Sequence, residues 1–353
     1  MRLVAILLPM LLVAGLSAED SVSVIRFGIP AVGIGGRPVT GGSFLSSVHI
    51  KGMLEKEFAP DGITVEWTFF KGAGPAVNEA LAAHQLDVTS LGDLPALVGR
   101  SVGLKTRLIL TTGSRASVYV AVPASSTERS LDDLKGKQLA IHQGTATQLL
   151  MARILAQHGL TEKDFRIVNL DTVASLAALT SGEIDGLWGS YNLYELQDRG
   201  IVRVIFDSHA DSLATGKPEV SAVGTVLVAE EFAQAHPAIV QRVVDVLVRE
   251  AVYDSNEDHR EELFTLWSKS GVLSSTYRRA YEGVPLALRQ SPLLDGFFAA
   301  SLKSGAEASK ALGYIRSAVD VDAWVDHSFL QQALARQGLA TFWTAYGADG
   351  KPQ

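Results

Sequence analysis

The sequence of 353 residues contains no cysteine. The chain can therefore form no disulfide and offers no thiolate metal ligand, no cysteine nucleophile and no lipid-accepting thiol. The net charge of −7 is modest for this length, and the acidic residues are spread along the chain, which argues against a nucleic-acid partner. Apart from the first residues, no apolar run approaches the roughly 18 residues of a membrane-spanning helix. We therefore expect a soluble mature protein, and the length favours two domains.

The first 18 residues have the layout of a secretory signal peptide. Arg2 provides a basic start, residues 3–16 form an apolar run, and Ser17 and Ala18 supply the small residues of a cleavage site. The run is short for a membrane span. We expect cleavage near Ala18 and a periplasmic protein without a lipid anchor. An uncleaved N-terminal anchor is the alternative.

Known catalytic and cofactor motifs are also lacking. The sequence has no nucleophile elbow, no zinc-protease motif and no phosphate-binding loop, and its eight histidines show no ligand spacing. The glycine-rich stretch at residues 33–38 does not match the dinucleotide-binding pattern. We therefore expect no catalytic residue, no metal site and no cofactor. His142 is the one histidine near a predicted site, where it either contacts a ligand or packs.

What the sequence does contain is two successive series of strand and helix patterns, followed after residue 230 by an almost purely helical region. In the first series one long amphipathic helix is expected at 43–58, and in the second Thr145 and Gln148 read as a capping box. This order predicts an α/β fold of two lobes, each a mostly parallel sheet flanked by helices, with a helical C-terminal region. The boundaries we expect are 22–115 plus 222–350 for lobe I, 122–210 for lobe II, and hinge crossovers at 115–122 and 208–222.

One strand-to-helix corner occurs in both series. In the first, Asp87 enters a strand that ends at Gly92; in the second, Asp185 enters a strand that ends at Gly189. Both aspartates lie at strand starts, so we expect them to serve turns rather than a ligand. The helix starts at these corners are the better candidates for ligand contact, and we expect them to face each other across a cleft between the lobes.

Helix starts suit an anion because their first N–H groups are unpaired and carry the positive end of the helix dipole. Ligands of open α/β sheets bind beyond the carboxyl ends of the strands, which is where these helices begin. Ordinary helix capping is the alternative at each corner. The candidate ligand-binding residues at these corners are Ser43, Gly74, Gly92, Asp93, Gly144, Thr145, Trp188 and Ser190.

Some of these side chains have two interpretations. Asp93 either caps its helix or pairs with an ammonium group of a ligand. Trp188 either packs against the organic part of a ligand or belongs to the core. Positive charge could come from Arg115 at the lobe crossover or from Arg37 in the long loop 31–42; each is otherwise a surface charge.

The chain resembles the periplasmic substrate-binding proteins of ABC importers for nitrate, taurine and aliphatic sulfonates. The most specific stretch is "DLKGKQLAIHQGT" followed by a helix. The other resembling segments lie in the family's order at residues 72–97, 131–160, 176–200, 230–241 and 321–334.

The resemblance implies a type II periplasmic-binding-protein fold, a hinged two-lobe clamp that closes on a small anionic solute and docks on a permease with its ATPase. It implies a monomer without catalysis and adds Phe44 to the candidate ligand-binding residues. The loop 31–42 is longer than the family pattern, so its contacts are open, and no single anion can be assigned. An enzyme on the same fold, resembling pyrimidine-precursor synthases, and a ligand-sensing module are the alternatives.

Overall fold

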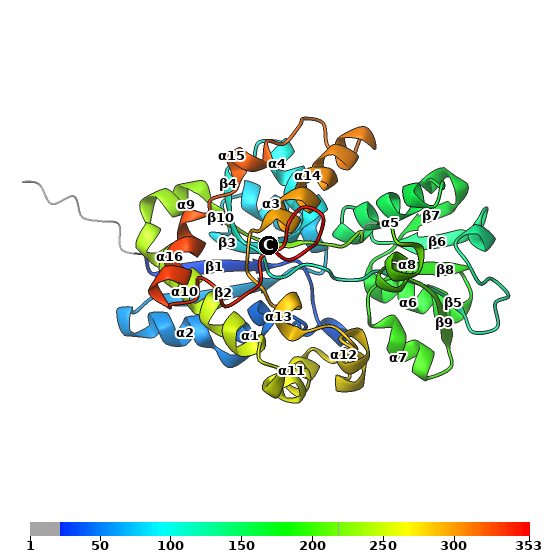
Figure 1. The fold of residues 1–353 in the computed structure, drawn as a ribbon, viewed down its shortest axis with the longest axis horizontal. Helices are drawn as coiled ribbons and strands as arrows, with labels where there is room; N and C mark the ends of the chain where they lie inside the picture. Colours follow the sequence, from blue (N-terminus) through cyan, green and yellow to red (C-terminus); the bar gives the residue numbers. More distant parts are fainter. Residues whose placement is uncertain (1–21, 218) are drawn as a thin grey trace, which may run out of the picture.

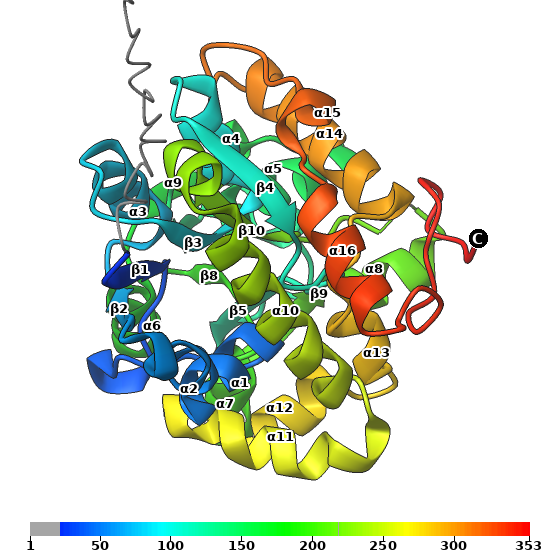
Figure 2. The same ribbon diagram turned by 90° about the vertical axis from the view of Figure 1, so that its left-hand side faces the viewer.

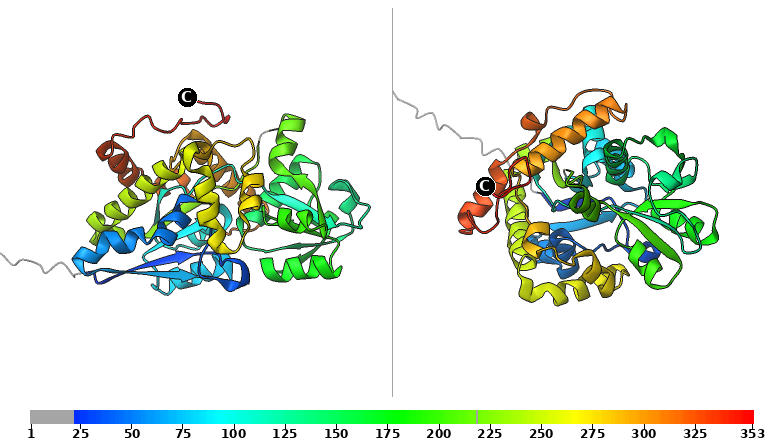
Figure 3. Two further views of the ribbon diagram at one scale, coloured as in Figure 1. Left: turned by 90° about the horizontal axis from the view of Figure 1, so that it is seen from below. Right: turned by 45° about the vertical axis from the view of Figure 1, so that its right-hand side comes forward.

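The computed structural model describes residues 22–217 and 219–353, so the predicted signal peptide lies outside the described residues. Two five-stranded sheets stand at opposite ends of the molecule, and the chain crosses between them twice (Figure 1). The two crossovers touch through an isolated antiparallel bridge between Ala116 and Ala222. The view from below shows the same separation into two lobes (Figure 3).

The sheet of the first lobe has the strand order β2-β1-β3-β10-β4. Its strands are β1 (Val24–Ile29), β2 (Thr64–Phe69), β3 (Val88–Gly92), β4 (Thr106–Leu110) and β10 (Gly224–Ala229). The sheet of the second lobe has the order β7-β6-β8-β5-β9. Its strands are β5 (Tyr119–Pro123), β6 (Gln138–Ile141), β7 (Arg166–Asn169), β8 (Gly186–Gly189) and β9 (Val202–Asp207).

Each sheet is mostly parallel, as predicted, with one reversed strand: four of the five strands run in the same direction, and β10 in the first sheet and β5 in the second run the other way. In the first, β1 runs parallel to β2 and β3, whereas β10 is antiparallel to β3 and β4. In the second, β6 runs parallel to β7 and β8, whereas β5 is antiparallel to β8 and β9. The reason is the path of the chain: β5 and β10 each enter their lobe directly from a crossover, so they start where the neighbouring strands end.

Helices cover the faces of both sheets. Around the first sheet lie α1 (Phe44–Lys51), α2 (Met53–Phe58), α3 (Ala73–Ala82) and α4 (Asp93–Ser101). Around the second lie α5 (Ala146–Gln157), α6 (Thr172–Ser181), α7 (Leu193–Asp198) and α8 (Ser208–Thr215). Short 3-10 turns cover Ile34–Gly36, Ala59–Asp61, Asp132–Leu134, Glu162–Asp164, Glu257–His259 and Ser268–Ser270.

The single helix expected at 43–58 is in fact two. Gly52 adopts a left-handed conformation (φ 61°) and ends α1, because a residue without a Cβ takes this conformation at little cost. Its N–H closes the helix on the carbonyls of Val48 and His49, and α2 starts at the next residue.

The C-terminal region is helical and packs on the first lobe. Its helices are α9 (Glu230–Ala235), α10 (Pro237–Asp254), α11 (Arg260–Trp267), α12 (Ser274–Ala280), α13 (Leu286–Arg289), α14 (Gly296–Ala311), α15 (Val321–Trp324) and α16 (Ser328–Arg336). The longest, α10, buries Val240, Val243, Val244 and Leu247, which lie three or four positions apart and so share one face. This face joins the core beneath β1, and α16 lies alongside α10 (Figure 2). Among the described residues, none of the helices combines the length and the apolar composition needed to cross a bilayer.

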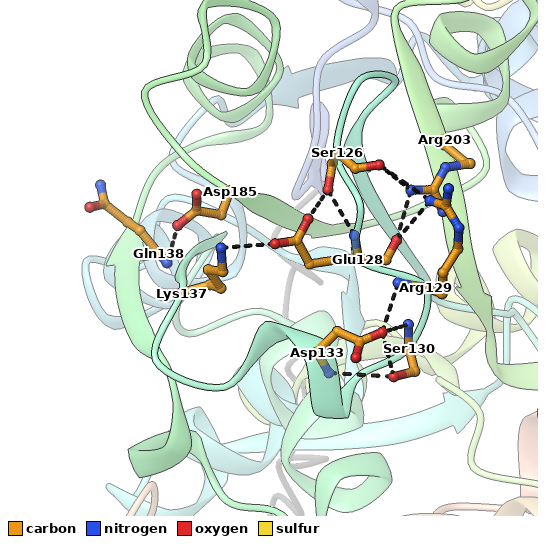
Figure 4. A network of polar contacts seen from close by, with 9 residues as sticks. All are labelled: Ser126, Glu128, Arg129, Ser130, Asp133, Lys137, Gln138, Asp185 and Arg203. Atoms are coloured by element: carbon orange, nitrogen blue, oxygen red, sulfur yellow. Dashed lines mark hydrogen bonds and ion pairs between the residues drawn. The ribbon is translucent and has the colours of Figure 1, made fainter.

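Asp87 and Asp185, the aspartates at the two strand starts, make the same backbone contact in both lobes. The Asp87 carboxylate accepts the N–H of Arg26 at the start of β1, and the Asp185 carboxylate accepts the N–H of Gln138 at the start of β6, each at 2.8 Å. Figure 4 shows the second contact, between the Asp185 carboxylate and the backbone N–H of Gln138. The prediction that these aspartates serve strand entry is confirmed.

Candidate functional site

A chamber of about 400 Å3 lies between the two lobes and opens into a smaller pocket of about 80 Å3. The two share His142, Thr172, Leu176, Ser190 and Asn192 as lining residues. The chamber walls come from the loop after β1, the start of α3, the starts of α6 and α7, and the segment between α11 and α12. This places the cavity where the parallel strands of both sheets end, as expected for a ligand site in this type of sheet.

The small pocket is lined by both polar and apolar residues: Thr147, Thr172, Ser175 and Ser190, with Leu176, Leu187 and Trp188. The hydroxyl of Ser175 donates to the carbonyl of Leu170, and that of Ser190 donates to Oδ1 of Asn192. Trp188 is 2 % exposed, and its indole N–H has no hydrogen-bond partner in the part of the chain that the structure describes. A buried donor without an acceptor is costly, so this group is a signal for a missing acceptor.

The first turn of α5 adds further donors. Thr147 is its second residue, and the first N–H groups of any helix lack intrahelical acceptors and carry the positive end of its dipole. A pocket that combines such a helix start with an unpaired indole N–H suits an anion.

The charges around the chamber are few and mixed. Lys71, exposed at the rim, follows β2, while Asp171 caps α6 and accepts the N–H groups of Val173 and Ala174 at 2.9 Å. These hydrogen bonds, first that of Ala174, hold the pKa of Asp171 below its usual range, with help from the charge of Lys71. Burial lowers the pKa of His142, which keeps its imidazole neutral near pH 7.

A second hollow of about 520 Å3 lies at the far end of the first sheet. Its rim carries Glu230 and Glu231, and His84 pairs with Glu231 at 2.7 Å. This acidic rim is unsuited to an anion, so the chamber between the lobes is the better candidate.

The sequence-predicted residues divide into two groups. Trp188 and Ser190 line the cavity. The glycines of the other corners pack against protein: a Cβ on Gly92 would lie 2.7 Å from Cβ of Ala146, and one on Gly144 would lie 2.9 Å from Cγ of Pro75. Gly74 would likewise meet Pro95 of its own lobe, at 2.3 Å. These glycines therefore allow close packing of protein against protein, and at Gly92 and Gly144 this packing joins the two lobes. Close approach to a ligand, the role expected from the sequence, is not what the glycines serve here.

The start of α1 is occupied by the protein itself. Ser43 caps the helix by accepting the N–H of Ser46, and the N–H of Phe44 donates to Oε1 of Gln290 at 2.8 Å. Gln290 is held in turn by the hydroxyl of Tyr281, which donates to the carbonyl of Gly42. The anion site expected at Ser43 and Phe44 is therefore filled by a glutamine side chain.

Of the two remaining corner residues, Thr145 differs from expectation and Asp93 takes one of its two expected roles. The hydroxyl of Thr145 donates to the carbonyl of His142 and does not cap α5, while Gln148 accepts the N–H of Gly144, so the expected capping box is absent here. Asp93 is fully buried where α4 packs on α5, and it accepts the N–H of Leu94 at 2.7 Å. Of its two interpretations, the structure supports a helix-start role.

Neither arginine lies in the cavity wall. Arg115 pairs with Glu219 at 3.1 Å and stacks on the rings of Phe297 and Tyr346. Its positive φ of 62° and its contacts make it a structural residue of the crossover. Arg37 donates to the carbonyl of Lys269.

The sequence analysis missed several lining residues. Lys71 and Asp171 each follow a strand that ends at the cleft, so the strand-end rule alone could have found them. No comparable signal marks Val272 or Tyr277, which reach the cavity from the helical region about 240 residues after the loop that they face.

Comparison with known proteins agrees with this geometry. Residues 58–255, more than half of the chain, match the family described as NMT1/THI5 like. The chain belongs to the NMT1/THI5-like family. A Bacillus subtilis protein provisionally named as aliphatic sulfonates-binding is 25 % identical over 291 residues, which cover 80 % of this chain and 82 % of that protein.

Solved structures show the same relationship. A protein of Methylobacillus flagellatus KT, provisionally described as the periplasmic sulfonate-binding protein SsuA of an ABC transporter, has 29 % identity and a TM-score of 0.77 over 92 % of this chain and 98 % of its own. The desulfurization enzyme DszB shares the fold at 18 % identity, with a TM-score of 0.63 over 89 % and 99 %. The predicted family resemblance and the periplasmic-binding-protein fold class are confirmed.

Proposed function

We propose that this NMT1/THI5-like protein is the solute-binding component of an ABC importer and captures an organic sulfonate between its two lobes. The observation that carries the proposal is the small pocket, which is lined by Thr147 of the first turn of α5 and by Trp188, whose buried N–H has no hydrogen-bond partner among the described residues. A sulfonate presents three acceptor oxygens to such a set of donors and needs no counter-charge beyond the helix dipole.

The relatives support the remaining parts of the proposal. The sulfonate-binding proteins named above belong to import systems, so the expected partners are a membrane permease and its ATPase. The protein would act in the periplasm as a monomer, after cleavage of the signal peptide and without a lipid anchor. Trp188 and Ser190 are the ligand-binding residues of this proposal, and Thr147, Thr172 and Ser175 join them from the pocket wall.

The proposal excludes catalysis, although the enzyme DszB shares the fold. The sequence has no cysteine that could act as a nucleophile, and His142 is the one histidine among the described residues that lines the cavity. A receptor should release its ligand unchanged, whereas an enzyme should consume it.

Calorimetric titration and thermal unfolding with a panel of anions test the proposal. Sulfonates, sulfate esters and nitrate are compared with neutral sugars, and the ligand is recovered and identified by NMR after incubation. We expect sulfonates to raise the melting temperature and to be recovered intact. Binding of neutral sugars but of none of the anions would overturn the proposal, and turnover of the ligand would favour the enzyme.

A Trp188→Phe variant tests the pocket directly. It keeps an aromatic ring but removes the N–H, and loss of a hydrogen bond to a charged group costs about 1.5–3 kcal/mol, or roughly 10- to 100-fold in affinity. Trp343→Phe is the matched control, because Trp343 also loses an indole N–H but donates it to Ser255 in the core of the first lobe. Equal sulfonate affinity in the two variants would remove Trp188 from the site.

A further inference from the structure

The larger chamber has a different character from the small pocket that opens into it. Around the chamber lie apolar side chains from three separate parts of the chain: Val32 and Ile34 of the loop after β1, Val173 and Leu176 of α6, and Val272 with Tyr277 from the helical region. Thr172 and Ser190 line the side shared with the small pocket, whereas Thr40, Ser270, Lys71 and Asp171 line other parts of the chamber. The chamber therefore offers apolar side chains together with a smaller number of polar ones.

Two of these apolar side chains lack protein cover. Ile34 is 43 % exposed and Val173 is 53 % exposed, although both line the chamber. They come from opposite lobes, so a ligand in the chamber would contact both.

The loop that carries Ile34 is held in place by an internal hydrogen bond and by close packing on the helical region. The N–H of Gly33 donates to the carbonyl of Arg37 at 2.8 Å and closes the loop on itself. The loop then packs on the segment before α12 so closely that a Cβ on Gly33 would lie 2.4 Å from the carbonyl oxygen of Ser270. A Cβ on Gly41, at the other end of the loop, would lie 2.2 Å from the hydroxyl oxygen of Tyr277. Glycine at both contacts lets backbone seat directly on the helical region and fixes the position of Ile34.

The volumes of the small pocket and of the chamber indicate what size of solute they can hold. A pocket of about 80 Å3 has room for a compact head group, since a water molecule takes about 30 Å3 in the liquid. The chamber of about 400 Å3 is within the range of pockets that enclose drug-sized ligands. A sulfonate with a one- or two-carbon tail would leave most of this apolar space to water.

We infer that the cargo is a sulfonate with a bulky apolar tail, such as an aromatic ring, and that the loop 31–42 selects it through Ile34 together with Val173. The inference rests on the proposed function, because the head group is assigned to the small pocket. The tail lies along the apolar side chains of the chamber, and burial of its surface supplies the added affinity.

Titration calorimetry with three probes tests the inference: methanesulfonate, benzenesulfonate and the neutral benzenesulfonamide. For the wild-type chain we expect benzenesulfonate to bind at least about tenfold more tightly than methanesulfonate, which corresponds to about 1.4 kcal/mol. In an Ile34→Ser, Val173→Ser double variant this ratio should fall to less than about threefold. Leu312→Ser, at an exposed apolar position (49 %) beyond α14, is the control and should keep the wild-type ratio.

Each outcome separates the inference from the proposed function. Equal affinities for the two sulfonates in the wild-type chain, or a ratio unchanged in the double variant, would overturn the inference and leave the sulfonate receptor standing. Benzenesulfonamide binding as tightly as benzenesulfonate would support the tail contacts and contradict the anionic head group. Binding of none of the three would overturn both. Because both substituted side chains are exposed, thermal unfolding of the double variant should match the wild-type chain.

Discussion

Asp93 gives the sharpest test of how the two lobes meet. Its side chain is 0 % exposed where α4 packs on α5, Oδ1 accepts the N–H of Leu94, and Oδ2 has no hydrogen-bond partner among residues 22–217 and 219–353. The facing charge is Arg153 of α5, whose guanidinium donates to the hydroxyl of Ser304 at 3.2 Å. Burial raises the pKa of Asp93 to about 7, although the N–H of Leu94 and the charge of Arg153 partly oppose the increase.

The sign and the size of the effect on stability follow from this pKa. The folded state binds the proton more tightly than the unfolded chain, in which an aspartate titrates near about 3.9. The stability that Asp93 contributes is therefore complete below about pH 4 and is lost as the pH rises towards about 7. Three pKa units correspond to about 4 kcal/mol at most. Relaxation around a buried charge reduces such penalties, so we expect a measured loss of about 2–4 kcal/mol.

An Asp93→Asn variant should abolish this loss. Its amide oxygen can still accept the N–H of Leu94, but it carries no charge at any pH. Urea unfolding at pH 4.5, 6.0 and 8.0 measures the free energy of unfolding of both proteins, and the variant should gain about 2–4 kcal/mol relative to the wild-type chain between the lowest and the highest pH.

A comparator is needed because Asp254 titrates in the same direction. Burial and the neighbouring Glu250 raise its pKa, while Ser47 donates to it at 2.6 Å and partly opposes the increase. Asp254 lies between α1 and α10 of the first lobe, remote from α5, so the effect of Asp254→Asn should add to that of Asp93→Asn. If Asp93→Asn shows the same dependence on pH as the wild-type chain, the carboxylate is not buried between the lobes and the reasoning is wrong.

Two further substitutions test the corrected assignments. Gly92→Val places side-chain atoms against Ala146, where a Cβ alone would already lie 2.7 Å from a methyl group. Overpacking at this contact costs about 1–3 kcal/mol and separates the lobes, so we expect calorimetry to show about tenfold weaker benzenesulfonate binding. Unchanged affinity would show that the contact is dispensable. Arg115→Ala breaks the ion pair with Glu219, in which the arginine side chain is 15 % exposed and the glutamate side chain 13 %. It should lower the free energy of unfolding in urea titrations by about 1–3 kcal/mol and leave the sulfonate affinity unchanged. A selective loss of affinity would restore Arg115 as a ligand contact.

The fold could be predicted from local patterns because most of its elements are specified locally. Alternating β-branched runs and amphipathic helices gave the element order, and the family resemblance gave the architecture. The direction of β5 and β10 was missed, because no local pattern reveals that a strand enters its sheet from a crossover. The break at Gly52 was missed for the opposite reason: a single residue interrupts an otherwise continuous apolar pattern.

The site was less predictable because a helix start can serve a ligand or the protein. At α1 the competitor for the Phe44 N–H is Gln290, which lies 246 positions later in the sequence. At β3 the glycine that could admit a ligand admits α5 instead. Sequence alone shows that a donor is available, but it does not show which acceptor lies closest in space.

The repeated corner illustrates this difference. Its strand-entry half makes the same backbone contact in both lobes, where Asp87 and Asp185 each accept an N–H of the neighbouring strand, and Asp87 also pairs with the guanidinium of Arg26. Its helix-start half is used differently: Gly92 contacts α5 of the other lobe, whereas Trp188 lines the small pocket, and its buried N–H has no hydrogen-bond partner among the described residues. Two lobes that enclose a solute need surfaces that touch as well as surfaces that stay apart. The repeat supplies both, because Gly92 has no side chain to keep the lobes apart and Trp188 brings a donor to the space that remains.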